Sequence, residues 1–76
     1  MNLKTFIPGK NAWVSTVKLG YPIGIKQKYF FESMVFKGNR HEITSYTEFE
    51  VDRYENEEEA RRGHIEMVGR WDRPES

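Results

Sequence analysis

The chain contains no cysteine, which excludes disulfide bonds, thiolate catalysis and the zinc sites that use cysteine ligands. No apolar run approaches the ~20 residues that a membrane-spanning helix needs, and the apolar stretch within residues 1–11 is too short for a signal peptide. The 12 basic and 12 acidic residues cancel, so the chain as a whole has no net charge to attract nucleic acid or a membrane. These absences favour a soluble, intracellular protein that does not associate with a membrane.

Size and composition indicate a single domain, residues 1–76. A chain of this length lies near the lower limit at which one core suffices, and only 37% of its residues are hydrophobic. Aromatic residues make up 14% of the sequence and compensate, because each of them can bury a large area. A thin core rich in aromatic side chains is therefore expected.

Alternating and β-branched residues predict an antiparallel sheet. Pro8 and Gly9 set residues 1–11 apart as an N-terminal segment or edge strand. Residues 12–54 hold antiparallel strands, separated by a loop rich in glycine and by a turn at Lys37–Arg40. The predicted strands are Ala12–Leu19, Tyr29–Lys37 and Glu42–Arg53.

A helix is predicted over residues 56–71, followed by a loose tail at residues 72–76. Asn56 is a favourable N-cap, and Glu59 stands three residues further on, as in a capping box. Gly63 costs the helix about 1 kcal/mol relative to alanine, which indicates a close approach to the sheet. Five residues recur at helical spacing and form one stripe: Ala60, His64, Met67, Val68 and Trp71. The predicted class is α+β (β-β-β-α), a three- or four-stranded antiparallel sheet with one C-terminal helix packed on one face.

The strand Tyr29–Lys37 is apolar on both sides, which raises the question of what covers each of them. A tight turn after this strand predicts that the helix packs on one set of alternate residues. That set is Phe30, Glu32, Met34 and Phe36. The reverse face is then uncovered, and exposed apolar patches commonly mark interaction surfaces. It is predicted to form the interface of a homodimer or larger oligomer, through Tyr29, Phe31, Val35 and Tyr46.

Glu32 and His64 are predicted to form a buried pair. Both would point into the same thin core, where an unpaired charge costs several kcal/mol. Pairing would raise the pKa of His64 and lower the pKa of Glu32. A catalytic acid–base pair is the alternative, but without another catalytic group the structural pair is favoured.

The loop Tyr21–Lys28 and the turn after the second strand carry residues that the sheet does not need. The candidate binding residues are Tyr21, Ile23, Ile25, Lys26, Lys28, Arg40 and His41. The two isoleucines have an equal claim to a place in the core. A protein surface or a small nucleotide is the expected ligand, because a compact pocket needs only two or three cations and one aromatic ring.

Nucleic-acid binding, metal binding and catalysis agree less well with the sequence than the binding of a protein or a small nucleotide. Residues such as Lys26, Tyr29 and Phe31 can stack and pair with nucleotides, but acidic residues of the third strand share their predicted face and oppose a polyanion. His41 and His64 do not make a metal site by themselves, and no cofactor is expected. No set of nucleophile, histidine and acid is evident, so the chain is predicted not to be an enzyme.

Three fragments follow one another at Trp13–Gly20 (WVSTVKLG), Tyr29–Phe36 (YFFESMVF) and Arg53–Val68 (RYENEEEARRGHIEMV). Together they resemble a group of small phage and prophage proteins. Its members read W-V-S-T, then F-E-[ST]-M-V-F, then R-Y-x-x-E-E-E-A-x-x-G-H-x-x-M-V. The resemblance covers most of the chain after Ala12. The chain departs from the pattern in the loop Tyr21–Lys28 and in a longer third strand.

The resemblance implies a viral or prophage origin and a place in the cytoplasm of a bacterial host, but no particular activity. The expected function is that of a non-enzymatic phage accessory protein, which binds a host protein or sequesters a small signalling nucleotide in host takeover or counter-defence. The alternatives are a structural or assembly factor of the virion, and a single-stranded nucleic-acid-binding module.

Overall fold

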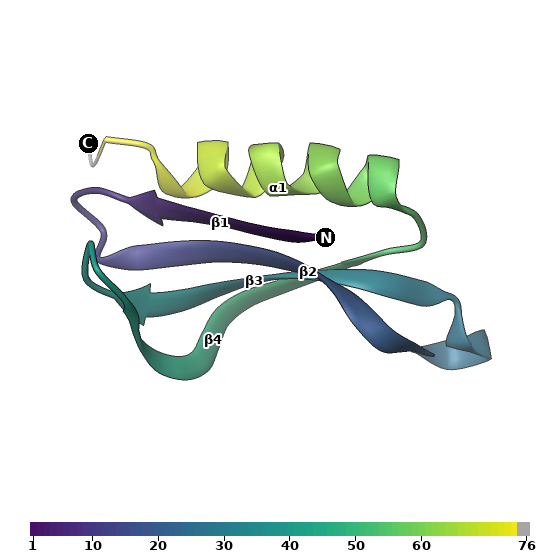
Figure 1. Ribbon diagram of the computed structural model, residues 1–76. Helices are drawn as coiled ribbons and strands as arrows, with labels where there is room; N and C mark the ends of the chain where they lie inside the picture. The colour runs from purple at the N-terminus through teal and green to yellow at the C-terminus, as the bar shows by residue number, and fades with distance from the viewer. Residues whose placement is uncertain (75–76) are drawn as a thin grey trace.

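Four antiparallel strands and one helix make up the fold in the computed structural model, which describes residues 1–74 (Figure 1). The strands lie in the sheet in their sequence order, β1-β2-β3-β4, and the helix packs on one face. The elements are β1 (Asn2–Ile7), β2 (Ala12–Ile23), the 3₁₀ turn η1 (Ile25–Gln27), β3 (Tyr29–Gly38), β4 (Ile43–Tyr54) and α1 (Glu57–Trp71). The predicted α+β class is confirmed, with the N-terminal segment as a fourth strand. The last two residues of the predicted tail lie outside the described residues.

The register of the strands decides which side chains lie under α1. Val14 is paired with Val35, and Thr16 is paired with Ser33, so these four side chains share a face of the sheet. All four are buried. The apolar core on this side consists of Ile7, Ala12, Val14, Val35 and Met67, with Val68 and Trp71 packed against it.

The predicted assignment of the two sheet faces is wrong. The helix covers the odd-numbered residues of β3, such as Phe31 and Val35, and not the set that contains Phe30 and Met34. Met34 is paired with Val51, but a register shift then pairs Phe36 with Glu48, and Phe49 stacks on Trp71 of the helix. The helix lies on the other face because small and hydroxylated side chains there allow its backbone to come close. On the sheet these side chains are Ala12, Thr16 and Ser33, and Ala60 is their small counterpart on the helix; all four are fully buried.

The helix begins as its sequence predicts. The Asn56 side chain accepts a hydrogen bond from the backbone N–H of Glu59 at 2.9 Å. The Glu59 carboxylate accepts from the backbone N–H of Glu55 at 3.4 Å, one residue before the cap. Ion pairs between Glu57 and Arg61 and between Glu58 and Arg62 run along its exposed side. Local sequence therefore fixes where α1 starts.

Gly63 explains how closely the helix approaches β4. A Cβ atom at this position would collide with the ring and hydroxyl of Tyr54. The predicted reason for a glycine inside the helix, a close approach to the sheet, therefore agrees with the structure.

We expect Gly63→Ala to lower the free energy of unfolding by about 1–3 kcal/mol, because overpacking against Tyr54 outweighs the better helix propensity of alanine. Gly69→Ala is the matched control, since its Cβ would meet no atom within 4 Å. That variant should gain up to about 1 kcal/mol. Urea denaturation measures both, and equal stabilisation of the two variants would contradict the close approach.

Candidate binding surface

A polar cluster lies at the centre of the contact between α1 and the sheet. His64 Nδ1 is hydrogen-bonded to Thr16 Oγ1 at 2.7 Å, and His64 Nε2 to Thr5 Oγ1 at 2.9 Å. Thr16 Oγ1 is in turn 2.5 Å from Ser33 Oγ. His64 is only 6% exposed, and its burial lowers its pKa. The cluster pairs the imidazole and hydroxyl groups beneath α1 with one another. The Tyr54 hydroxyl is also buried, and it has no hydrogen-bond partner among the described residues.

The predicted pair between Glu32 and His64 is therefore wrong. Glu32 lies on the opposite side of the sheet, where its carboxylate accepts a hydrogen bond from Arg53 Nε at 3.1 Å. The histidine finds neutral hydroxyl partners, so nothing raises its pKa as a carboxylate would. A buried imidazole with two hydroxyl partners is stable in its neutral form.

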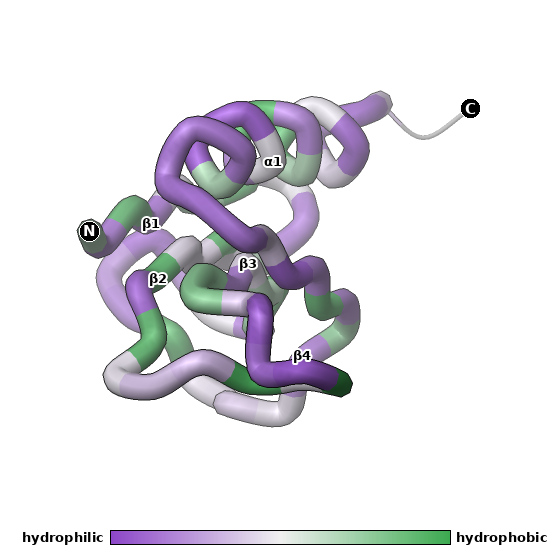
Figure 2. Tube along the Cα trace, turned by 90° about the vertical axis from the view of Figure 1, so that its right-hand side faces the viewer, coloured by the Kyte–Doolittle hydropathy of each residue, from purple (hydrophilic) through white to green (hydrophobic). Residues whose placement is uncertain are grey.

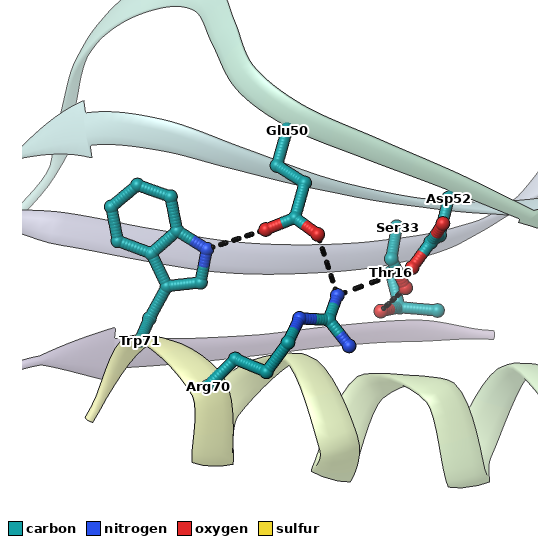
Figure 3. A network of polar contacts seen from close by, with 6 residues as sticks. All are labelled: Thr16, Ser33, Glu50, Asp52, Arg70 and Trp71. Carbon is teal, nitrogen blue, oxygen red and sulfur yellow. Dashed lines mark hydrogen bonds and ion pairs between the residues drawn. The ribbon is translucent and has the colours of Figure 1, made fainter. Parts of the chain in front are cut away.

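Two carboxylates of β4, Glu50 and Asp52, lie on the helix side, contrary to the prediction that they lie on the face that the helix leaves uncovered. Glu50 accepts hydrogen bonds from Arg70 Nη2 at 2.6 Å and from Trp71 Nε1 at 2.8 Å (Figure 3). Arg70 Nη2 also contacts Asp52 at 3.2 Å. The hydrogen bond from Trp71 and the nearby Arg70 lower the pKa of Glu50. This network fastens the end of α1 to β4 and removes two negative charges from the reverse face.

The face of the sheet opposite α1, called the open face below, has no second layer of secondary structure in the described chain (Figure 1). Cross-strand pairing places Phe6, Trp13 and Phe36 in one row across it. Its other apolar residues include Val17, Phe30, Met34 and Val51, and its charged residues include Lys4, Glu32 and Arg53. Phe30 is 41% exposed. The open face thus combines an aromatic centre with few charges.

The structure revises the predicted oligomer interface. Phe31 and Val35 are only 7% and 0% exposed because α1 covers them, so they cannot form a surface. Tyr29 packs against Gly24, where a Cβ atom would lie 2.6 Å from its ring. Of the four predicted residues, only Tyr46 lies openly on the surface, with 70% of its area exposed. Its ring covers Phe36, at 5.1 Å between centroids.

The β3–β4 turn folds over one end of the open face and forms a groove there. Trp13 Nε1 donates a hydrogen bond to the backbone oxygen of Asn39 at 2.7 Å, which holds the turn against β2. Gly38 permits this closure, since a Cβ atom there would collide with Glu42 and Trp13. The groove has a volume of about 250 Å³ and is lined by Lys4, Trp13, His41, Glu42, Ile43 and Tyr46.

The hairpin of β2 and β3 forms an arm that projects beyond the start of α1, at the lower right of Figure 1. Tyr21 and Ile25 are largely exposed on it, whereas Ile23 is half-buried and paired with Tyr29 in the sheet. Residues 21–23 are therefore strand and not loop. A shallow groove at the tip, about 510 Å³ in volume, is lined by Gly24, Ile25, Lys26, Lys28, Tyr29 and Arg53.

The predicted binding residues consequently fall into two groups at opposite ends of the molecule. Arg40 and His41 lie in the β3–β4 turn, while Tyr21, Ile25, Lys26 and Lys28 lie on the arm (Figure 1). Of these six, only His41 lines the groove on the open face. The sequence did not indicate Lys4 and Trp13 as binding residues. They lie far from His41 along the chain, and only the folded sheet brings the three together.

Charge is distributed unevenly along the chain, although the basic and acidic residues balance in number. Residues 1–31 contain five lysines and no acidic residue, and all 12 acidic residues follow from Glu32 onwards. β1, β2 and most of the arm are therefore basic, and the remainder of the chain is acidic overall. Counting charges by segment would have shown this asymmetry.

Comparison of the chain with known protein families, with curated proteins and with solved structures finds no match. Within residues 1–74, no three residues of the types His, Cys, Asp and Glu are grouped so that they could hold a metal ion. Over the same residues, no helix is both long enough and apolar enough to cross a membrane.

We expect the protein to lose stability as the pH falls below about 6.5, the ordinary pKa of histidine. The pKa of His64 is lowered in the folded state, so the unfolded chain takes up a proton first, and stability declines as the pH falls through the folded pKa. Between pH 7.5 and pH 5, the urea concentration at the midpoint of unfolding should fall less in His64→Gln than in the wild type. His41→Gln changes a residue on an exposed turn, so its urea midpoint should fall with pH as in the wild type. If His64→Gln leaves the pH dependence of the midpoint unchanged, the assignment to His64 is refuted.

Proposed function

We propose that the chain is a non-enzymatic binding protein of phage or prophage origin, which engages a host protein through its open face. The observation that carries this proposal is an aromatic sheet face without a covering layer, on which Phe30 and Tyr46 are 41% and 70% exposed. Uncovered apolar patches of this kind mark interaction surfaces. The phage origin and the host cytoplasm rest on the resemblance of the three sequence fragments.

The character of the open face favours a protein over a polyanion. Glu32 and Arg53 pair with each other, which leaves Lys4 as the unbalanced charge among the residues that define the face. Nucleic-acid binding depends on several cations that neutralise phosphates, so one lysine is too few. Protein interfaces instead have an aromatic and aliphatic centre with a polar rim. Host takeover or counter-defence would follow from capture of a host protein, and virion assembly from capture of a virion protein.

We expect Phe30→Ser combined with Tyr46→Ser to reduce partner capture at least tenfold, because aromatic side chains dominate binding energy. The cost in stability should be about 1 kcal/mol, since both residues are exposed and only the Tyr46–Phe36 ring contact is lost. Tagged protein is incubated with lysate of infected host cells, and captured proteins are quantified by mass spectrometry.

Tyr21→Ser is the matched control, since Tyr21 is as exposed as Tyr46 but lies on the arm. It should capture the same partner as the wild type. If the double variant captures that partner undiminished, the open face is not the binding surface. Enrichment of a virion protein in place of a host protein would make the chain an assembly factor.

A small nucleotide is a second candidate ligand, favoured by the groove at the end of the open face. Trp13 and Tyr46 supply aromatic surface there, while Lys4 and His41 supply positive or polar groups. Its volume of about 250 Å³ limits the ligand to a small one. Sequestration of a signalling nucleotide would use this groove and leave the rest of the open face free.

We expect adenosine or uridine 5′-monophosphate to shift the NMR signal of the Trp13 indole N–H, without moving that of Trp71, which is bonded to Glu50 on the helix side. Lys4→Gln should weaken binding roughly tenfold, since it removes the phosphate's cation. Arg40→Gln should have no effect, because Arg40 does not line the groove. If the Trp13 indole signal does not shift at millimolar nucleotide, a nucleotide is eliminated as a ligand of this groove.

A further inference from the structure

The outer edge of β1 presents a row of backbone groups without partners. β1 is the first strand of the sheet, at its edge under α1 (Figure 2). The backbone oxygen of Met1 accepts a hydrogen bond from Lys18 N at 3.3 Å, which fixes the alternation of the ladder. Odd-numbered residues of β1 therefore bond to β2, and the N–H and C=O groups of Asn2, Lys4 and Phe6 point outward.

The two edges of the sheet differ in how well they are protected. β4 shifts its register three times against β3 between Val35 and Gly38, and such bulges block the addition of another strand. β1 instead pairs with β2 over six successive residues without a shift. β4 is regular only over Glu50–Tyr54, so β1 offers the longer regular template for a further strand.

The side of α1 turned away from β4 carries one exposed aliphatic residue. Gly63 and Arg70 lie on the flank of α1 over β4, as their contacts with Tyr54 and Glu50 show. At about 100° per residue, Ile65 lies on the opposite flank, on the side of β1. Its side chain is 71% exposed although it is one of the larger aliphatic residues.

The charge of this part of the molecule selects the occupant. Lys4 stands at the middle of β1, within the 31 residues that contain five lysines and no acid. A second copy pairing its β1 about a central two-fold axis would place Lys4 directly opposite Lys4, which is destabilising. An acidic strand would instead place a carboxylate opposite Lys4.

We propose that β1 is a docking edge, which takes up an extended acidic segment of a partner protein as an antiparallel fifth strand. Residues opposite Asn2, Lys4 and Phe6 carry the carboxylates on the open-face side, and the residues between them are aliphatic and lie on the helix side of the sheet. The edge shares Lys4 and Phe6 with the open face, but Phe30 and Tyr46 lie on β3 and β4, so a variant at those two residues tests the open face without altering β1.

The probe is the peptide acetyl-Thr-Glu-Val-Glu-Val-Glu-Thr-amide, with a counterpart in which lysine replaces each glutamate. Titrated into ¹⁵N-labelled full-length protein, the glutamate peptide should shift the amides of Asn2, Lys4 and Phe6 and slow their hydrogen exchange. It should bind at least tenfold more tightly than the lysine peptide. Lys4→Glu should reverse that preference.

Two controls keep the result independent of how the variant folds. N-methylation of the three glutamates should abolish binding, because their N–H groups face β1, whereas N-methylation of the two valines should be tolerated. The Phe30→Ser and Tyr46→Ser double variant should still bind the peptide, even if it loses the open-face partner.

Equal affinity for both peptides, or shifts confined to open-face residues such as Phe30 and Met34, would overturn the proposal. Protection of the Asn2, Lys4 and Phe6 amides without peptide, together with a dimer in sedimentation equilibrium, would also overturn it, since a second copy would then occupy the edge.

Discussion

The close contact between α1 and the sheet is the constraint on which the other features depend. Gly63 brings the helix backbone onto Tyr54, and the small residues Thr16 and Ser33 leave room beneath it. Hydroxyl groups buried in such a contact need hydrogen-bond partners, and the two ring nitrogens of His64 bond to the hydroxyls of Thr16 and Thr5. A larger residue at any of these places would lift the helix and expose the core. α1 thus covers the face that its backbone can approach most closely, and not the face with the larger apolar side chains.

That choice leaves the bulkier aromatic side chains on the other side of the sheet. The ring centroids of Trp13 and Phe6 lie 5.3 Å apart with the rings tilted, and Tyr46 lies over Phe36, so rings cover rings where a second layer would otherwise lie. The question raised by a strand that is apolar on both sides has a divided answer. One side is covered by the helix, and the other partly by its own aromatic neighbours and by the β3–β4 turn.

Local features of the chain were predictable, and features that depend on distant residues were not. The cap at Asn56 and the glycine at position 63 act within one or two turns, so their patterns indicated the helix and its approach. The faces of β3 could not be told apart, because both alternate sets are apolar and alternation then carries no information. Glu50 looked solvent-facing as a carboxylate, yet Arg70 and Trp71, about 20 residues further on, hold it on the helix side. The groove likewise joins β1, β2 and the β3–β4 turn, which only the folded sheet brings together.

The hydrogen bond between Thr5 and His64 joins residues 59 positions apart, and it links the first strand to the last element of the fold. During synthesis, β1 and β2 leave the ribosome long before α1 exists to cover them. The hydroxyls of Thr5 and Thr16 then face water, and the apolar groups beside them remain exposed until the helix emerges. Folding that must await such a distant contact is slow compared with that of local hairpins. The nascent chain therefore passes through a stage at which a chaperone, or another nascent chain, has access to its unfinished core.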